Sequence, residues 1–297
     1  MRELKVLRSL LFVPADNESK LVKARQIPAD ALVLDWEDSV APESRPSARK
    51  RTAEVLKERQ QFPQVILIRV SGVGTQSFQA DCDVLANELP DGLMLSKCCS
   101  AEDVLRLAEF LKDRDPQGRC GIYPLIESPA GLLNAFAITT SSDRVAGLAF
   151  GAEDFSAETG LYRTADEIEL LYARSMLVTA GRAAGREVYD SPCIEFQDLE
   201  KLRGSARRAR NLGFTGKMAI HPSQVAVLNA TFSPTEAEVE RARSLLEGFS
   251  SQNAGVVVLE GQMVDEAVLR QARRVLSIAA GSPDPQKANK SSAIVDG

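Results

Sequence analysis

The chain has 297 residues, of which 44% are hydrophobic, so it is long enough to form one large α/β domain with an ample core. Its 36 lysines and arginines stand against 41 aspartates and glutamates, and the formal net charge of -5 excludes a global positive field that would attract nucleic acid or an anionic membrane. Because no apolar run reaches the roughly 18 residues of a membrane span and the N-terminal segment has no signal-peptide cleavage pattern, we expect a cytoplasmic protein.

Eight short apolar runs are predicted to be β-strands, and longer polar stretches with helical spacing separate them. Runs that are apolar on both faces and alternate with helices indicate a parallel sheet. Eight such units over about 220 residues are typical of an α/β fold of the (β/α)₈ TIM-barrel type, and a doubly wound open sheet with fewer strands is the alternative. The runs cover residues 9–13, 31–35, 65–70, 92–96, 120–126, 145–150, 186–190 and 216–220.

The chain continues beyond the eighth run, so three segments are expected. The barrel is predicted to occupy residues 1–230, a C-terminal helical extension or lid residues 231–280, and a disordered tail residues 281–297, which contain few large apolar side chains. Thr164 with Glu167 is predicted to form a helix capping box. A second box is predicted from Ser233 to Glu236.

Charged residues gather where the predicted strands end. Barrel enzymes carry their chemistry at the carboxyl ends of the strands, so these side chains are predicted to meet at one mouth of the barrel. By contrast, the segment "SGVGTQ" at residues 71–76 lacks the full G-x-G-x-x-G pattern and does not predict a phosphate loop. The residues at the strand ends are Asp35, Glu37, Asp38, Arg69, Lys97, Glu127, Glu153, Asp154, Asp190 and His221.

A cluster of carboxylates requires a positive partner. Oxygen donors without nearby thiolate or imidazole suit Mg²⁺, with Mn²⁺ as a second possibility, and we predict Glu127 and Asp154 as the direct ligands. The single histidine, His221, excludes a three-histidine zinc site and is interpreted as a turn residue. Structural alternatives stay open, since Glu127 could cap the following helix and Arg69 could belong to a structural ion pair.

Several motifs follow one another in an order that resembles a known family. They are "RSLLFVPADNESKLVKA", "LDWEDSV", "LIRV", "PLIESPAGLLNA", "GLAFGAEDFSAETG", "GFTGKMAIHPSQV" and "FSPTEAEVERA". Together they are similar to the citrate lyase beta-subunit group of acyl-CoA lyases, within the wider HpcH/HpaI aldolase family, over nearly the whole chain. The resemblance implies a Mg²⁺-dependent barrel enzyme that makes or breaks a C–C bond between acetyl-CoA, or a related thioester, and a 2-oxo acid.

The resemblance also implies roles for single residues. Glu127 and Asp154 match the metal ligands of the family, where Glu127 also faces the substrate, and Arg69 matches the arginine that contacts the oxo acid. Glu37 and Asp38 match an acidic pair that holds metal-bound water and the active-site network.

One residue of the C-terminal extension is assigned in the same way. Asp265 resembles an aspartate of the C-terminal lid that reaches a neighbouring subunit's site as acid or base, although an Asp in this position would otherwise be interpreted as a helix cap. Independently of the resemblance, the charge of the first helix makes Lys20, Lys23 or Arg25 a candidate contact for the anionic CoA tail, with a solvated helix face as the alternative. The family implies a homo-oligomer, a trimer or a hexamer, and an acyl-carrier protein is a possible partner.

The predicted activity is the cleavage or formation of a 3-hydroxy-3-carboxyacyl thioester such as citryl-CoA or malyl-CoA. The alternatives are a metal-dependent class II pyruvate aldolase, a malyl-CoA-type thioesterase and a non-catalytic subunit that binds a CoA ester or a carrier protein. Relatives of the aldolase type usually carry an E-H pair after the second strand, where this chain has Glu37 and Asp38, which disfavours the aldolase. Ser71 and Ser96 depart from the usual asparagine and proline of the family, so the identity of the substrate is not fixed.

Overall fold

A computed structural model describes residues 6–250, 256–259 and 262–281. Contacts within the chain divide it into two compact units, Met1–Phe232 and Ser233–Gly297, which are described one after the other. In the described part of the chain, no helix is long and apolar enough to cross a membrane.

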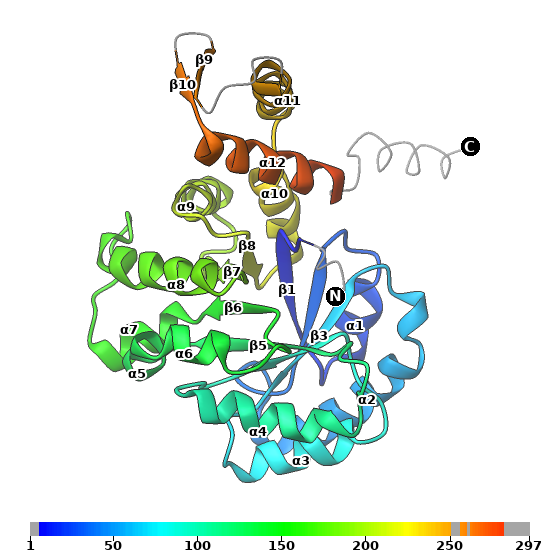
Figure 1. Ribbon diagram of the computed structural model, residues 1–297. Coiled ribbons are helices and arrows are strands. Elements are labelled where there is room, and N and C mark those ends of the chain that lie inside the picture. The colour runs from blue at the N-terminus through cyan, green and yellow to red at the C-terminus, as the bar shows by residue number, and fades with distance from the viewer. Residues whose placement is uncertain (1–5, 251–255, 260–261, 282–297) are drawn as a thin grey trace. The chain divides into compact units, whose positions relative to one another are not determined.

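The first unit is a closed barrel of eight parallel strands (Figure 1). The strands follow one another in sequence order, and β8 pairs with β1, where Ser9 lies opposite Lys217. This closure confirms the TIM-barrel prediction and excludes the open doubly wound sheet. Each strand lies within two residues of its predicted bounds: β1 Ser9–Pro14, β2 Ala31–Asp35, β3 Val65–Val70, β4 Gly92–Leu95, β5 Gly121–Ile126, β6 Gly147–Phe150, β7 Glu187–Asp190 and β8 Gly216–Ala219.

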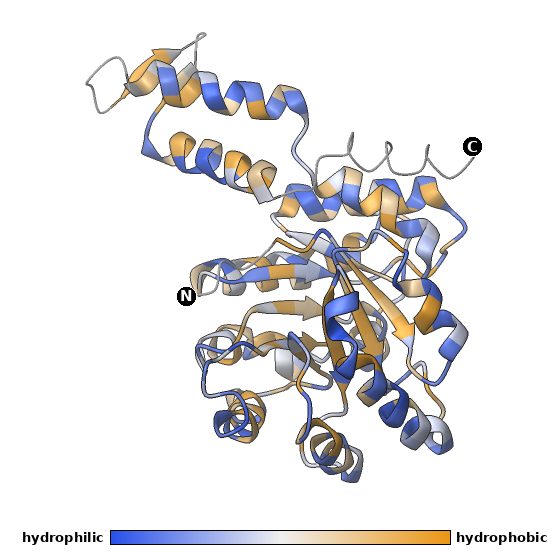
Figure 2. Cartoon of the chain, turned by 90° about the vertical axis from the view of Figure 1, so that its right-hand side faces the viewer, coloured by the Kyte–Doolittle hydropathy of each residue, from blue (hydrophilic) through white to orange (hydrophobic). Residues whose placement is uncertain are grey.

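Helices surround the barrel, and the buried apolar side chains form two separate layers. The strands, which lie between the two layers, are among the most hydrophobic segments of the chain (Figure 2). One layer fills the barrel interior with side chains such as Leu10, Val33 and Met94. The other lies between strands and helices and includes Ile68 and Leu107. Burial of both faces explains why these strands read as continuous apolar runs. The helices of this unit are α1 Glu18–Ala24, α2 Arg45–Lys57, α3 Gln76–Leu85, α4 Ala101–Lys112, α5 Pro129–Leu133, α6 Ala135–Thr140, α7 Ala152–Thr159, α8 Leu171–Ala183, α9 Leu199–Leu212 and α10 Pro222–Phe232, with short 3₁₀ turns at Pro42–Ser44, Arg59–Gln61 and Ile168–Leu170.

The capping box predicted between Thr164 and Glu167 does not form, because Thr164 bonds a different acid. The Thr164 hydroxyl and amide bond Glu169, at 2.5 and 3.1 Å, and not Glu167. Glu167 instead adopts a left-handed backbone conformation, with φ of 55°, and its side chain turns into the protein. Several acids lie close together in this loop, and tertiary partners decide which of them bonds the threonine.

The second unit contains α11 (Glu236–Ser250), a hairpin of β9 (Val257–Leu259) and β10 (Gln262–Val264), and α12 (Glu266–Gly281). A small core of Val257, Val264 and Leu269 holds it together. The box before α11 is shifted from the prediction by two residues, since Thr235 and Glu238 bond each other's backbone amides at 3.2 and 2.7 Å. Residues 282–297 of the expected tail lie outside the described residues.

Candidate active site at the barrel mouth

Arg69, at the end of β3, forms the centre of the acidic cluster on β2. Its Nε and Nη2 donate to the two carboxylate oxygens of Asp35 at 2.7 and 2.6 Å. Its Nη1 lies 2.8 Å from Asp38 and 3.3 Å from Glu37. The guanidinium also lies over the ring of Phe12, 4.9 Å from its centroid. One buried cation therefore compensates the three carboxylates that crowd the end of the second strand.

Asp35 fixes the orientation of this arginine. The carboxylate is completely buried and also accepts hydrogen bonds from the amides of Glu37 and Ser39, at 3.0 and 3.1 Å. Burial opposes ionisation of Asp35, but hydrogen bonds and the charge of Arg69 outweigh it and lower its pKa. Because the Arg69–Asp35 pair occupies two of the guanidinium nitrogens, Nη1 is the nitrogen directed to the exposed side of the cluster.

Glu37 ionises less readily than an ordinary glutamate. Its side chain is mostly buried and accepts a hydrogen bond from Ser96 Oγ at 3.3 Å. Burial raises its pKa to about 7, against the opposing charge of Arg69, and the neighbouring Asp38 adds to the increase. Glu37 can therefore exchange a proton near neutral pH, which is a property of general acids and bases.

Glu127 and Asp154 share a single cation in the structure. The ammonium of Lys97, which follows β4, contacts Asp154 and lies 3.7 Å from Glu127 Oε1. The Lys97 amide donates to the same Glu127 oxygen at 2.6 Å. Glu127 follows β5 and is buried, whereas the side chain of Asp154, in the first turn of α7, is 43% exposed. Burial raises the pKa of Glu127, and the charge of Lys97 opposes that increase.

Gly151 makes room for the Glu127 carboxylate. A Cβ atom at residue 151 would lie 2.6 Å from Glu127 Cβ and 2.8 Å from its Oε2, which is too close for any side chain. The end of β6 therefore requires glycine for Glu127 to keep this position.

A cavity of about 330 Å³ opens between these groups. Because acids, the arginine and apolar side chains from β1, β5 and β8 all line it, the cavity can hold a small polar molecule by its charged end. It is lined by Phe12, Asp35, Asp38, Ser39, Arg69, Leu125, Glu127, Gly151, Ala152, Glu153, Asp154, Pro192, Met218 and Ile220.

The pair of Glu127 and Asp154 fits a hard divalent ion. Both carboxylates already face one cation position, which Lys97 fills, and no sulfur or imidazole ligand is involved. Among the residues that the structure describes, no group of three or more His, Cys, Asp or Glu side chains could hold a metal. Mg²⁺ commonly binds through one or two carboxylates and keeps water or substrate oxygens as its other ligands, so two carboxylates are sufficient.

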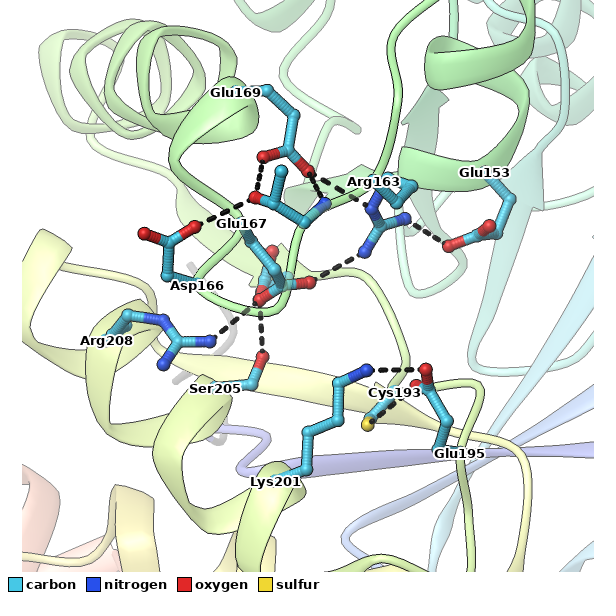
Figure 3. A network of polar contacts seen from close by, with 12 residues as sticks. Glu153, Arg163, Asp166, Glu167, Glu169, Cys193, Glu195, Lys201, Ser205 and Arg208 are labelled. Atoms are coloured by element: carbon cyan, nitrogen blue, oxygen red, sulfur yellow. Dashed lines mark hydrogen bonds and ion pairs between the residues drawn. The ribbon is translucent and has the colours of Figure 1, made fainter.

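A second polar network supports the helix that carries Asp154 (Figure 3). Glu153, its neighbour on α7, pairs with Arg163, which lies 2.7 Å from buried Glu167. Glu167 in turn accepts hydrogen bonds from Ser205 on α9 at 3.0 Å and from Arg174 on α8 at 3.2 Å. The loop between α7 and α8 is thus anchored to α8 and α9.

Two further residues of the predicted site belong to α1 and to the start of α12. Lys20 is exposed in the first turn of α1 and does not line it. Asp265 belongs to the second unit, where its carboxylate accepts from the amides of Ala267 and Val268 at 2.9 and 3.1 Å and caps α12. His221 is exposed, bonds Ser223 and stacks on Phe196, as expected for a turn residue.

Sequence reasoning did not assign three residues that shape the site. The sequence places Asp35 in an acidic cluster without a role of its own, and its position at a buried strand end beside an arginine on the next strand is a usable signal. The sequence places Lys97 at a strand end and indicates no role for it, and nothing in the sequence predicts its left-handed backbone, with φ of 54°. Gly151 precedes the acids of α7, and its close contact with Glu127 needs the fold to be known.

The fold and the site together define a barrel enzyme. Acids and an arginine from separate strands meet at the carboxyl ends of a closed (β/α)₈ barrel, which is the position of the active site in characterised enzymes of this fold. The chain belongs to the HpcH/HpaI aldolase/citrate lyase family, whose model matches residues 8–222. This confirms the family predicted from the motifs.

Several curated proteins are similar over most of their length. The chain is 31% identical to the citrate lyase subunit beta of Leuconostoc mesenteroides subsp. cremoris, over 94% of this chain and 95% of that protein. It is 31% identical to the human mitochondrial citramalyl-CoA lyase, over 92% of this chain and 85% of that protein. It is also 30% identical to the (3S)-malyl-CoA thioesterase of Cereibacter sphaeroides (strain KD131 / KCTC 12085), over 92% of this chain and 94% of that protein.

Solved structures show the same similarity. The protein CitE of Mycobacterium tuberculosis, in complex with magnesium, acetoacetate and coenzyme A, superimposes with a TM-score of 0.78 at 31% identity, over 92% of this chain and 97% of that one. The citrate lyase beta subunit of M. tuberculosis, in complex with oxaloacetate and magnesium, superimposes with a TM-score of 0.69 at 30% identity. The match covers 79% of this chain and 100% of that one.

Proposed function

We propose that this protein is a Mg²⁺-dependent carbon–carbon lyase, which cleaves or forms a 3-hydroxy-3-carboxyacyl thioester such as citryl-CoA or malyl-CoA. The products of cleavage are acetyl-CoA, or a related acyl-CoA, and a 2-oxo acid. The observation that carries the proposal is the pair of Glu127 and Asp154 around one cation position, in the same cavity as Arg69. The relatives named as citrate lyase subunit beta and citramalyl-CoA lyase support the reaction class, and the magnesium complexes of CitE support the metal.

The proposed mechanism uses the groups in the positions described. Glu127 and Asp154 would hold Mg²⁺, which when bound supplies a template and Lewis acid for the substrate's carboxylate and hydroxyl oxygens. Arg69, held by Asp35, directs Nη1 at the oxygen that becomes the 2-oxo group and stabilises negative charge there. Because Asp35 fixes the guanidinium before the substrate arrives, little reorganisation is needed as the C–C bond breaks.

Cleavage also needs one proton to leave the hydroxyl and one to reach the departing enolate carbon. Glu37, with its pKa of about 7, and the adjacent Asp38 are the acids of the mouth that can take the hydroxyl proton. We keep Asp265 as the candidate that delivers a proton to carbon, from a neighbouring subunit of a trimer or hexamer. Lys20 is the candidate contact for the CoA tail, and the thioester could equally be carried by an acyl-carrier protein.

Thioester hydrolysis is the second candidate function, because a malyl-CoA thioesterase is among the relatives. The two functions differ in their products. A lyase releases an acyl-CoA and a 2-oxo acid without free thiol, whereas a thioesterase releases free CoA and a hydroxy acid.

A product assay over citryl-, malyl-, methylmalyl- and citramalyl-CoA, with and without Mg²⁺, tests the proposal. We expect 2-oxo acid release that needs Mg²⁺, and we expect Arg69→Ala to lower kcat/KM by about 10²-fold or more, since a preorganised charge partner is lost. Arg106→Ala is the matched control, because Arg106 lies exposed on α4, where it pairs with Glu102. Free thiol without oxo acid would establish the thioesterase instead, and no turnover of any ester would contradict both.

A further inference from the structure

Ser96 directly follows β4 and is a completely buried polar residue at the barrel mouth. Its amide donates to Val70 O at 3.2 Å, so the pairing of β4 with β3 extends to this residue. Met94, two positions earlier, belongs to the apolar layer inside the barrel, and side chains alternate along a strand, so Ser96 projects to the same side at the open end. The family pattern has proline here, which could supply neither this amide nor a hydroxyl.

The Ser96 hydroxyl contacts Glu37, one of the two acids assigned to proton transfer. It donates to Glu37 Oε2 at 3.3 Å, and Arg69 Nη1 lies 3.3 Å from the same oxygen. The two donors belong to neighbouring strands or their ends, β3 and β4, so two strands together hold one carboxylate oxygen. Glu37 is mostly buried, and a low local dielectric strengthens hydrogen bonds of this kind.

Ser96 is a neutral group among the charges that surround Glu37. Burial raises the pKa of Glu37 to about 7, and a hydrogen bond with Asp38 adds to the increase, whereas the charge of Arg69 opposes it. The charged groups at Glu37 and along the cavity that it lines are Asp35, Asp38, Arg45, Arg69, Lys97 and Glu127. A hydroxyl differs from them because it can donate to an ionised carboxylate and accept from a protonated one. Ser96 can therefore stay bonded to Glu37 in both protonation states.

We propose that Ser96 is a positioning residue, which keeps the Glu37 carboxyl group in one place while it takes up and releases a proton. The catalytic part of the inference rests on the proposed function, because Glu37 is there a group that takes the substrate's hydroxyl proton. Proton transfer needs hydrogen-bond distance between its two partners, so a carboxyl group that turns away transfers the proton less often. Ser96 should therefore affect proton transfer more than the binding of the oxo acid.

A double-mutant cycle tests the contact without an assay of activity. Ser96→Ala, Glu37→Gln and the double variant are unfolded thermally without metal near pH 5 and near pH 8. Because ionised Glu37 loses a donor, Ser96→Ala should lower the Tm by several degrees more at the higher pH, and this difference should vanish in the Glu37→Gln background. Ser191→Ala is the matched control and should show no such difference. Ser191 directly follows β7 and is also buried, but its hydroxyl has no hydrogen-bond partner among the described residues.

Turnover of the ester that the wild type accepts measures the positioning role. Removal of the hydroxyl in Ser96→Ala should raise the pKa of Glu37, so the acid limb of the pH profile of kcat/KM should move up by about one pH unit. At the same time kcat should fall by about tenfold, whereas the Kd of pyruvate with Mg²⁺ should stay within about twofold of the wild type. Ser96→Thr keeps a hydroxyl and should restore most of kcat. A role in packing alone would not move the pH profile.

The outcomes separate the role of Ser96 from the proposed function. If the cycle shows no pH-dependent coupling, Ser96 does not hold Glu37 and the inference is wrong, whatever the activity. If the coupling is present but kcat and the acid limb of Ser96→Ala match the wild type, the contact is structural and the positioning role is wrong, while the proposed function stands. If the wild type turns over no thioester, the proposed function fails, and the catalytic role of Ser96 fails with it.

Discussion

At the scale of single residues, the site depends on carboxylates that differ in their readiness to ionise. Asp35 is held ionised by Arg69, whereas burial leaves Glu37 with a pKa of about 7, two positions along the same segment. The two readings of Arg69 made from the sequence, as a structural ion pair and as a substrate contact, therefore do not compete. The pair with Asp35 occupies Nε and Nη2, while Nη1 bonds Asp38, which lines the cavity.

The raised pKa of Glu37 predicts a pH dependence of stability. Its folded pKa of about 7 lies above the ordinary 4.5, so its contribution to stability is complete below pH 4.5 and is lost as the pH rises through 7. Glu37→Gln, which stays neutral, should therefore melt at the same temperature as the wild type near pH 4.5 and several degrees higher at pH 8, without added metal. Differential scanning calorimetry at both pH values checks this, with exposed Glu158→Gln as control. A lower Tm for Glu37→Gln at pH 8 would contradict the assignment.

At the scale of elements, the sequence predicts the strands correctly, whereas both predicted helix capping boxes differ from those in the structure. Parallel strands buried on both faces give unbroken apolar runs, so all eight were found within two residues. At Thr164 the predicted partner is wrong because Glu167 turns to Ser205 and Arg174, and Glu169 bonds the threonine. The box predicted at Ser233 forms two residues further on, between Thr235 and Glu238.

The anchoring of the loop between α7 and α8 predicts a large effect at Glu167. Arg174 and Lys217 lower the pKa of Glu167 to about 2 despite its burial, so its ionised form stabilises the fold above pH 4.5, and this contribution is lost as the pH falls towards 2. Glu167→Gln should cost about 3 kcal/mol at pH 7, a Tm decrease of roughly 6–12 °C, and the difference should shrink below pH 4. Chemical and thermal denaturation measure it, and Glu158→Gln on α7 is again the control. A variant as stable as the wild type at pH 7 would show that the network is dispensable.

At the scale of the whole molecule, the sequence predicted which residues meet, and the structure adds how they meet. The carboxyl ends of parallel strands lie at one face, so the proximity of Arg69, Glu127 and Asp154 followed once a barrel was assumed. The sequence does not predict which side chains pair with one another. Lys97, which contacts Asp154, has a left-handed backbone conformation that its sequence does not indicate. Asp265 caps α12 within its own unit, and its catalytic role stays a prediction.

A crystal structure of the protein with Mg²⁺ and pyruvate would show whether Glu127 and Asp154 hold the metal beside Arg69. We expect one ion bonded to an oxygen of Glu127 and an oxygen of Asp154, with pyruvate on that ion beside Arg69 Nη1. The Lys97 ammonium should be withdrawn from the position that it fills between the two carboxylates. An ion bound elsewhere, or Lys97 still between Glu127 and Asp154 while pyruvate occupies the cavity, would contradict this expectation.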